Sequence, residues 1–368
     1  MRLTRSSATF IGCALALAAC SSGSDSSPAT SAVVGTTRPG ITEPASTSAS
    51  TAGTSSTAAG AASTSTSATV PAEPVMPLTG LPITDPSAAG RTALVVKIDN
   101  HPDARPQSGL NQADIVFEEN VEQLTRFAAV FQTTAPDPVG PIRSGRTQDV
   151  ELLGSLNKPI FAWSGGNPGV TKAINGSDLV VANVQSNARS ASKSYRSRDR
   201  IAPHNLYAQG SGLFTMTDSA ETPPPQQFAY YKSGEPVQGD PAASVAVKMD
   251  GVSVSWKYDT KTSRYLRFQG GKAHNDAALG QVDATNVVVL VVDYQPSAVD
   301  TKSPEAQTTG TGEAWAFSGG KFVHGKWTRA DRLNPYTLTA DNGAPILLSP
   351  GRTWVELART DSTTANPS

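Results

Sequence analysis

The sequence is poor in cysteine and in net charge, and it has no long apolar run. Two cysteines among 368 residues cannot make a disulfide framework or a four-thiolate metal site. A formal net charge of −1 excludes the basic field with which nucleic-acid-binding proteins attract their ligand, so we expect no nucleic-acid partner. No stretch reaches the roughly 20 apolar residues of a transmembrane helix.

Aromatic and charged residues are also scarce, at 6% and 17% of the chain. Globular domains contain about 25% charged residues, so a low-complexity segment must dilute an ordinary core. That segment is residues 21–70, in which half of the residues are Ser or Thr and none is aromatic. Such a composition buries too little apolar surface to offset the entropy of ordering. We therefore predict a disordered linker over residues 20–74.

The first 20 residues have the organisation of an export signal. Arg2 and Arg5 precede a short apolar stretch, which ends in Leu17-Ala18-Ala19-Cys20. This ending resembles the lipobox of bacterial lipoproteins, in which the cysteine is lipidated. The resemblance implies a signal peptide at 1–19 and a lipid anchor on Cys20. We expect this anchor to place the protein on the outer face of the bacterial cytoplasmic membrane, because two acyl chains suffice for stable attachment.

Two halves of different character follow the linker. Residues 75–225 alternate continuous apolar runs, such as 94–98 and 160–163, with helical spacing over 147–156. These patterns predict an α/β domain with a mixed sheet. Residues 226–360 contain alternating and Val-rich strands and two hairpin patterns, which predict a β-rich domain. Residues 361–368 are expected to be a flexible tail.

Three known catalytic or ligand-binding motifs are incomplete or absent in the sequence. The segment Gly320–Lys326 has Walker spacing, but Trp327 stands where Ser or Thr must bind the metal. Ser164 lacks the first glycine of a nucleophile elbow. The four histidines are scattered along the chain, without the spacing of a zinc motif. We therefore expect neither a metal site nor a cofactor.

The informative feature is the group of polar residues that follows each buried strand. In open α/β sheets, ligands bind beyond the carboxyl ends of the strands. If these strands are parallel, their polar ends converge on one site. The candidate ligand-binding residues at these ends are Ser164 and Gly165, together with four residues that would orient the ligand, Asp99, Asn100, Glu118 and Glu119.

Four arginines, namely Arg105, Arg126, Arg143 and Arg146, lie close in sequence to these strand ends. Arginines grip carboxylates and phosphates bidentately, so the four predict a binding pocket for an anion. The alternative is an ion-pair network that only holds the loops in place. Trp163 is a candidate stacking wall for the ligand or else a core residue. A basic stretch at 189–200 is a second possible contact for an anionic polymer.

Several strings of the folded part resemble the YerB-like bacterial lipoproteins, which have a two-part domain of unknown function. The resemblance covers about residues 75–358 and implies an anchored envelope protein, without an established reaction or catalytic residues. The strings that carry it are Val96–Pro102, Arg105–Gln107, Ala113–Val116, Gly140–Arg146, Pro203–Tyr207, Gly312–Trp315 and Pro350–Val355.

Three functional hypotheses follow. The first is a lipid-anchored envelope protein that binds an anionic ligand, such as a wall glycan, a wall polymer or a lipid headgroup, in the polar cleft. The second is a cell-wall hydrolase that uses Glu118 or Glu119 with Asp99 or His101. The third is a non-catalytic scaffold whose β-rich half binds another envelope protein.

The lipid anchor can be tested directly in cells grown with a fatty-acid probe. We expect the wild-type protein to incorporate the probe and Cys20→Ala to lose it, because the thiol of Cys20 is the attachment point. Protein purified from labelled cells and examined by in-gel detection gives the result. Equal labelling of both proteins, or none in the wild type, would refute lipidation at Cys20.

Overall fold

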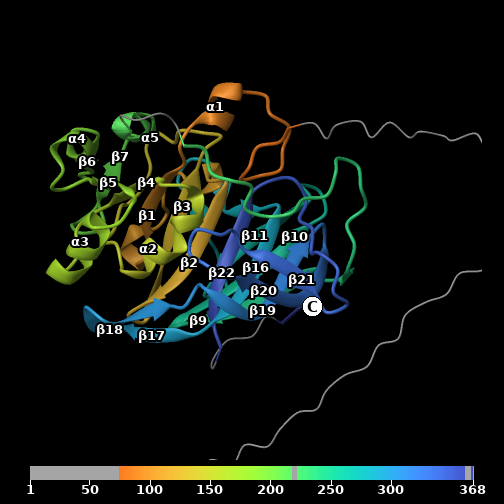
Figure 1. The fold of residues 1–368 in the computed structure, drawn as a ribbon. Helices are drawn as coiled ribbons and strands as arrows, with labels where there is room; N and C mark the ends of the chain where they lie inside the picture. Colours follow the sequence, from red (N-terminus) through yellow and green to blue (C-terminus); the bar gives the residue numbers. More distant parts are fainter. Residues whose placement is uncertain (1–73, 218–221, 361–365, 368) are drawn as a thin grey trace, which may run out of the picture. The chain divides into compact units, whose positions relative to one another are not determined.

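One large sheet of eleven strands runs through both halves of the chain (Figure 1). The computed structural model describes residues 74–217, 222–360 and 366–367. The expected signal peptide, Cys20 and nearly all of the linker lie outside the described residues. The expected tail also does, except for β23 (Asn366–Pro367), which pairs with β9.

The large sheet mixes parallel and antiparallel pairs, which confirms the predicted mixed sheet. In spatial order its strands are β21 (Thr337–Ala340), β20 (Lys321–Arg329), β19 (Gly310–Ser318), β16 (Asn286–Val292), β22 (Thr353–Arg359), β2 (Ile115–Val121), β3 (Leu124–Phe131), β1 (Leu94–Asp99), β4 (Ile160–Trp163) and β5 (Val180–Asn183), with β8 (Asp240–Pro241) paired to β20.

The remaining described strands form a second sheet and three short ribbons, and all of them except the β6–β7 ribbon confirm the β-rich C-terminal region. The second sheet contains β12 (Lys272–Ala273), β11 (Arg264–Gln269), β10 (Val252–Asp259), β9 (Ser244–Met249) and β23, with β15 (Asp283–Ala284) on β11. The ribbons pair β13 (Asn275–Asp276) with β14 (Gly280–Gln281), β17 (Tyr294–Ser297) with β18 (Asp300–Ala306), and β6 (Ser194–Arg196) with β7 (Leu206–Ala208).

The helices are short, and none of those described is long and apolar enough to cross a membrane. The α-helices are α1 (Pro86–Gly90), α2 (Gln148–Leu152), α3 (Pro168–Asn175), α4 (Ala188–Ala191) and α5 (Gly210–Leu213). The 3-10 helices are η1 (Pro102–Ala104), η2 (Leu110–Gln112), η3 (Gly154–Leu156) and η4 (Phe214–Met216).

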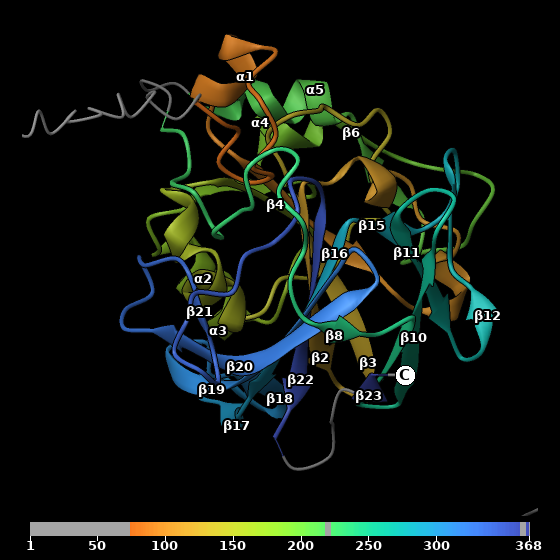
Figure 2. The same ribbon diagram turned by 90° about the vertical axis from the view of Figure 1, so that its right-hand side faces the viewer.

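The central strands are apolar on both faces because the large sheet is the middle layer. Leu94 and Val96 of β1 pack in one hydrophobic cluster, whereas Val95 packs in the other. The first cluster also contains Trp256 of the second sheet, and the other contains Ile174 of α3. Figure 2 shows α2 and α3 on one side of the large sheet and β10 and β11 on the other. Each fully buried aliphatic side chain stabilises this arrangement by roughly 1.5–3 kcal/mol.

Strand β22 joins the two halves. It pairs in parallel with β16 of the C-terminal half and with β2 of the N-terminal half. In this register Glu118 of β2 lies opposite Glu356 of β22. Residues expected to belong to different domains therefore share one continuous hydrogen-bonded sheet.

The β2–β3 hairpin is supported from the second sheet by the Asp250-Gly251 turn between β9 and β10. Gly251 has a φ of +65°, and a Cβ at this position would lie 2.4 Å from the carbonyl oxygen of Gln123. The backbone N–H of Asp250 donates to Oδ1 of Asn120 over 2.8 Å. Only glycine accommodates both this backbone conformation and this close approach.

Candidate functional site

The carboxyl ends of three strands meet at one edge of the large sheet. Strands β1 and β4 are parallel, and β1 and β2 are both antiparallel to β3, which lies between them. Strands β1, β2 and β4 therefore run in the same direction, which meets the condition for their polar ends to converge. Arg126 of β3 faces Asp99 in the β1 register and Glu119 in the β2 register. Residues from four strands thus gather at this edge.

Glu118 points to the second sheet and is fully buried there. Its Oε2 accepts a hydrogen bond from Nη2 of Arg267 over 2.6 Å, and its Oε1 accepts one from Thr125 over 2.7 Å. The side chain of Arg267 is also fully buried. Burial, followed by the negative charge of Glu118, raises the pKa of Glu356 well above its ordinary value. The neutral form of Glu356 is thereby favoured, and Arg267 neutralises Glu118.

Glu119 points to the opposite face, as the alternation of side chains along a strand requires. Its Oε1 accepts from Nζ of Lys97 over 2.6 Å, and the same ammonium donates to Asp149 over 2.6 Å. Gln148 donates to the other oxygen of Glu119. Burial, with a contribution from the charge of Asp149, raises the pKa of Glu119 to about 7, although Lys97 lowers it.

These contacts correct the roles assigned to both glutamates. Glu118 and Glu119 have no exposed surface, and cations of the chain hold each of them. Neither side chain can reach a polymer or another ligand at the surface. Their position therefore contradicts the predicted ligand-orienting and catalytic roles, and the two carboxylates serve the core instead.

Asp99 is 3% exposed and organises the loops at the sheet edge. Its Oδ2 lies 2.7 Å from Nδ1 of His204 and 3.1 Å from Nε of Arg143. Its Oδ1 accepts from the backbone N–H of His101 over 3.0 Å. The rings of His101 and His204 stack, with centroids 4.2 Å apart. Two histidines that we expected to be scattered therefore lie together.

Arg126, Arg143 and Arg146 form a cluster at the same edge, which we call the arginine cluster. Arg143 pairs with Asp99, and Nη2 of Arg146 donates to both carboxylate oxygens of Glu122 over 2.8 Å. Arg126 is 8% exposed and donates to the carbonyl oxygen of Ser144 over 2.9 Å. Burial, followed by the charges of Arg146 and Arg143, lowers the pKa of Arg126 to about 10. The arginines are thus close enough to repel one another.

Asn100 and Arg105 are joined to the Glu118 network rather than to the arginine cluster. Arg105 donates to the carbonyl oxygen of Asn100 over 2.8 Å and to its Oδ1 over 3.2 Å. The amide of Asn100 donates to Thr125, which itself bonds to Glu118. The four predicted arginines therefore divide into a cluster of three and a separate Arg105.

The predicted features around β4 serve the structure. Ser164 is buried and donates to the carbonyl oxygen of Ile142 over 3.0 Å. Gly165 has a φ of +72°, and the helix that follows it is capped by Asn167, whose Oδ1 accepts from the N–H of Val170. Trp163 is fully buried. Of the two alternatives for Trp163, its burial supports the core residue and excludes the stacking wall, because a ligand cannot reach its ring.

The basic stretch is folded onto the same loops. Arg200 donates to the carbonyl oxygens of Asp103 and Pro106 over 3.1 and 2.6 Å. Arg196 donates to Oδ1 of Asn205 over 2.8 Å. These bonds fix the loop that carries His204 beside the loop that follows β1.

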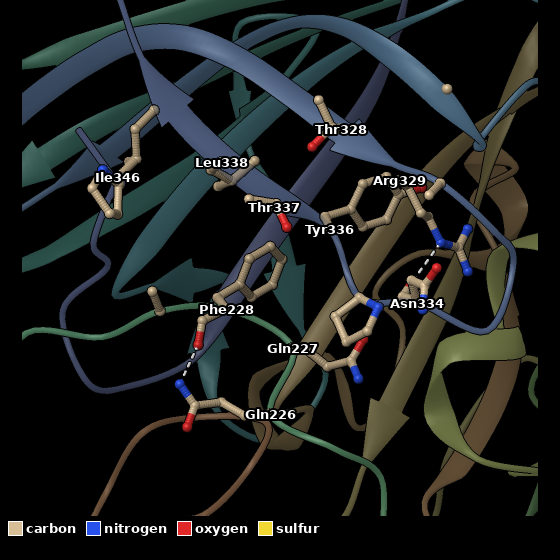
Figure 3. Close-up of a pocket in the computed structure, with 15 residues that line it drawn as sticks. Gln226, Gln227, Phe228, Thr328, Arg329, Asn334, Tyr336, Thr337, Leu338 and Ile346 are labelled. Carbon is tan, nitrogen blue, oxygen red and sulfur yellow. Dashed lines mark hydrogen bonds between the residues drawn. The ribbon is translucent and has the colours of Figure 1, made fainter. Parts of the chain in front are cut away.

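A cavity of about 730 Å³ lies away from this edge, where residues 226–229 meet β20 and β21 (Figure 3). Phe228, Tyr336 and Leu338 contribute apolar surface to it. Arg329 also lines it, but its Nε already donates to the carbonyl oxygen of Asn334. No predicted ligand-binding residue lines this cavity.

Sequence reasoning missed four partners of the predicted residues: Lys97, His204, Arg267 and Glu356. Lys97, Arg267 and Glu356 lie within or next to apolar strand patterns. The residues around a charged side chain in such a strand do not indicate which distant residue pairs with it. His204 does have a signal, because it belongs to the Pro203–Tyr207 string that carries the family resemblance.

Comparisons with known proteins agree with that resemblance. Two family models match the chain: the N-terminal domain of a protein of unknown function (DUF3048) over residues 78–222, and the C-terminal domain of the same family over residues 244–355. YerB of Bacillus subtilis (strain 168), named as a candidate lipoprotein, is 28% identical over 301 residues, which are 76% of this chain and 85% of YerB.

A crystal structure of the YerB protein from Bacillus subtilis has a similar fold. Its TM-score is 0.68 at 26% sequence identity, and the match covers 79% of this chain and 99% of that chain. The N-terminal family match contains every predicted ligand-binding residue from Asp99 to Gly165.

The raised pKa of Glu119 predicts a pH-dependent stability. The folded state keeps a proton that the unfolded chain releases near pH 4.5. The free energy of unfolding should therefore fall as the pH rises from 4.5 to about 7, with a slope of at most about 1.4 kcal/mol per pH unit for one proton. In Glu119→Gln, which cannot ionise, the free energy of unfolding should depend less steeply on pH. The raised pKa of Glu356 should cause part of the pH dependence that this variant keeps.

Urea unfolding of the wild type, Glu119→Gln and the exposed control Glu235→Gln at about pH 5, 6 and 7 measures these slopes. We expect Glu235→Gln to follow the wild type. If Glu119→Gln shows the wild-type slope, Glu119 does not hold the proton.

Proposed function

The chain belongs to the two-part DUF3048 family, and from this premise we propose that it is a lipid-anchored envelope protein that binds an anionic ligand at the arginine cluster. The anchor is Cys20, on the outer face of the cytoplasmic membrane. The bound group is a phosphate or carboxylate of an envelope ligand. The lipoprotein assignment is supported by the likeness to YerB.

One observation carries the proposal: the arginine cluster has more positive charge than its carboxylate partners neutralise. Its three guanidinium groups face Asp99 and Glu122 as ion-pair partners. Among the described residues, no carboxylate oxygen lies within 4.0 Å of the Arg126 guanidinium, whose hydrogen bond goes to a neutral carbonyl. Counted against its two ion-paired carboxylates, the cluster has one more positive charge than negative, which an anion would neutralise.

The cluster also has hydrogen-bond donors for such an anion. Nε of Arg146 is buried and has no hydrogen-bond partner. The Arg143 side chain is 25% exposed and that of Arg146 is 13% exposed, so solvent reaches the cluster. A charged hydrogen bond at a partly buried site of this kind is worth about 1.5–3 kcal/mol.

A small cavity next to the cluster supports access for a ligand. It has a volume of about 230 Å³ and is lined by Glu122, the partner of Arg146, together with Lys302 and Arg359. The lining also contains Asp250, so its two acidic and two basic side chains balance, and the cavity supports the proposal through access and not through charge.

The hydrolase hypothesis lacks this support, because its proposed carboxylates, Glu118 and Glu119, are fully buried. A hydrolase needs an acid or base that reaches the substrate, whereas a protein that only binds its ligand does not. We therefore expect cell-wall material to be retained by the protein without the release of soluble fragments.

Sedimentation with insoluble cell-wall material tests this function, using the full chain purified in detergent. We expect Arg143→Gln to weaken retention roughly 10- to 150-fold, the equivalent of about 1.5–3 kcal/mol. Arg332→Gln is the matched control, because Arg332 is 23% exposed and pairs with Asp178 over 2.6 Å, much as Arg143 pairs with Asp99. Thermal melts of both variants verify the fold.

A parallel experiment with anionic vesicles distinguishes lipid headgroups from wall polymers as the source of the anion. Equal retention of Arg143→Gln and Arg332→Gln would contradict a site at the arginine cluster. Release of soluble fragments would favour a hydrolase, and no retention of the wild type on either material would favour the scaffold hypothesis.

A further inference from the structure

Three side chains of metal-ligating type meet beside Asp99. His101 follows β1, Asp103 lies in η1, and His204 lies in the loop before β7. One potential ligand atom from each of the three lies within 4.8 Å of those of the other two. Since His204 is about a hundred positions away in sequence, the fold and not a local motif creates this group.

Asp99 orients His204 as a metal-binding histidine is usually oriented. Oδ2 of Asp99 lies 2.7 Å from Nδ1 of His204, which leaves Nε2 as the nitrogen that can bind an ion. Metal-ligating histidines almost always donate their second N–H to a carboxylate, a carbonyl or water. The His204 side chain is only 10% exposed, so its ring is held in this orientation.

The two loops are also tied to each other. Arg200 donates to the carbonyl oxygen of Asp103 over 3.1 Å and to that of Pro106 over 2.6 Å. Oδ1 of Asp99 accepts from the N–H of His101. These bonds keep His101, Asp103 and His204 near one another without using their ligand atoms.

We propose that His101, Asp103 and His204 bind a divalent transition-metal ion of the Zn²⁺ type, with Asp99 as the outer carboxylate. Two imidazoles and one carboxylate are a donor set that Zn²⁺ accepts, and three protein ligands leave one position for water or an anion. Asp99 and Asp103 together offset the charge of the ion. Arg143 also contacts Asp99 and therefore lies beside the outer carboxylate of the proposed site.

Metal binding requires the ring of His101 to turn. The two histidine rings are stacked at an interplanar angle of 13°, and one ion cannot lie in the planes of both rings in that arrangement. The side chains of His101 and Asp103 are 36% and 58% exposed, so both can move while His204 stays fixed. The ion thus replaces a stacking contact between two rings with coordination by both.

Isothermal titration of the full chain in detergent with ZnCl₂ tests the site. All proteins carry Cys13→Ala and Cys20→Ala, so that no thiol competes for the ion. We expect one Zn²⁺ per chain, loss of this binding in His101→Ala and His204→Ala, and a roughly 10- to 100-fold weaker site in Asp99→Asn, as for other outer-shell partners.

His324→Ala is the matched control, because His324 also contacts two carboxylates, Glu313 and Asp341, but has no second histidine beside it. We expect this variant to bind Zn²⁺ as the parent does. Thermal melts give a second readout: Zn²⁺ should raise the melting temperature of the parent and of His324→Ala, but not that of the exposed variant His101→Ala. Unchanged binding in His101→Ala, or no binding by the parent at micromolar concentrations, would overturn the proposal.

Discussion

The ion pair between Glu118 and Arg267 lies in the core between the two sheets, and both side chains are fully buried. Two charges removed from water are tolerated when most of their remaining polar atoms are also bonded, and in this pair Nε of Arg267 is the atom without a hydrogen-bond partner. Glu118 accepts from Thr125, and Nη1 of Arg267 donates to Gln269. Removal of either partner would leave a buried charge uncompensated, at a cost of about 3–5 kcal/mol. The second sheet is thereby fixed on the large one.

The need of buried charged groups for hydrogen-bond partners also fixes the loops at the sheet edge. Thr125 links Glu118 to Asn100, and Asn100 in turn accepts from Arg105. On the opposite face, Lys97 joins Glu119 to Asp149, and Asp149 accepts from the N–H of Arg146 over 2.6 Å. Charges that cannot reach solvent therefore hold the segments that carry the arginine cluster and the histidines. The buried carboxylates thereby support the backbone beneath the partly exposed Arg143 and Arg146.

Local pattern was sufficient to predict much of the fold. The apolar runs of β1 and β16 and the alternation of β10 follow from side-chain periodicity, whereas the common direction of β1, β2 and β4 comes from the structure. The same reasoning places polar residues at one sheet edge. Arg126 and Arg143 could be assigned to that edge because each lies near a predicted strand end.

The partners of those residues could not be predicted, because sequence separation hides them. Glu118 meets Arg267 across 149 positions, and Asp99 meets His204 across 105. Nothing local distinguishes a strand-end glutamate that faces a buried arginine from one that faces solvent. Trp163 shows the same limit, since only the packing of α3 against β4 decides whether its ring is buried or lines a cleft.

The central claim is that an anion binds at the arginine cluster. Its most direct test is a phosphate titration of the full chain in detergent, followed by NMR of the arginine Nε–H groups. We expect saturable shifts at Arg126, Arg143 and Arg146 and none at the control Arg332. Shifts confined to the basic stretch at 189–200, or equal shifts at Arg143 and Arg332, would contradict an anion site at this edge of the sheet.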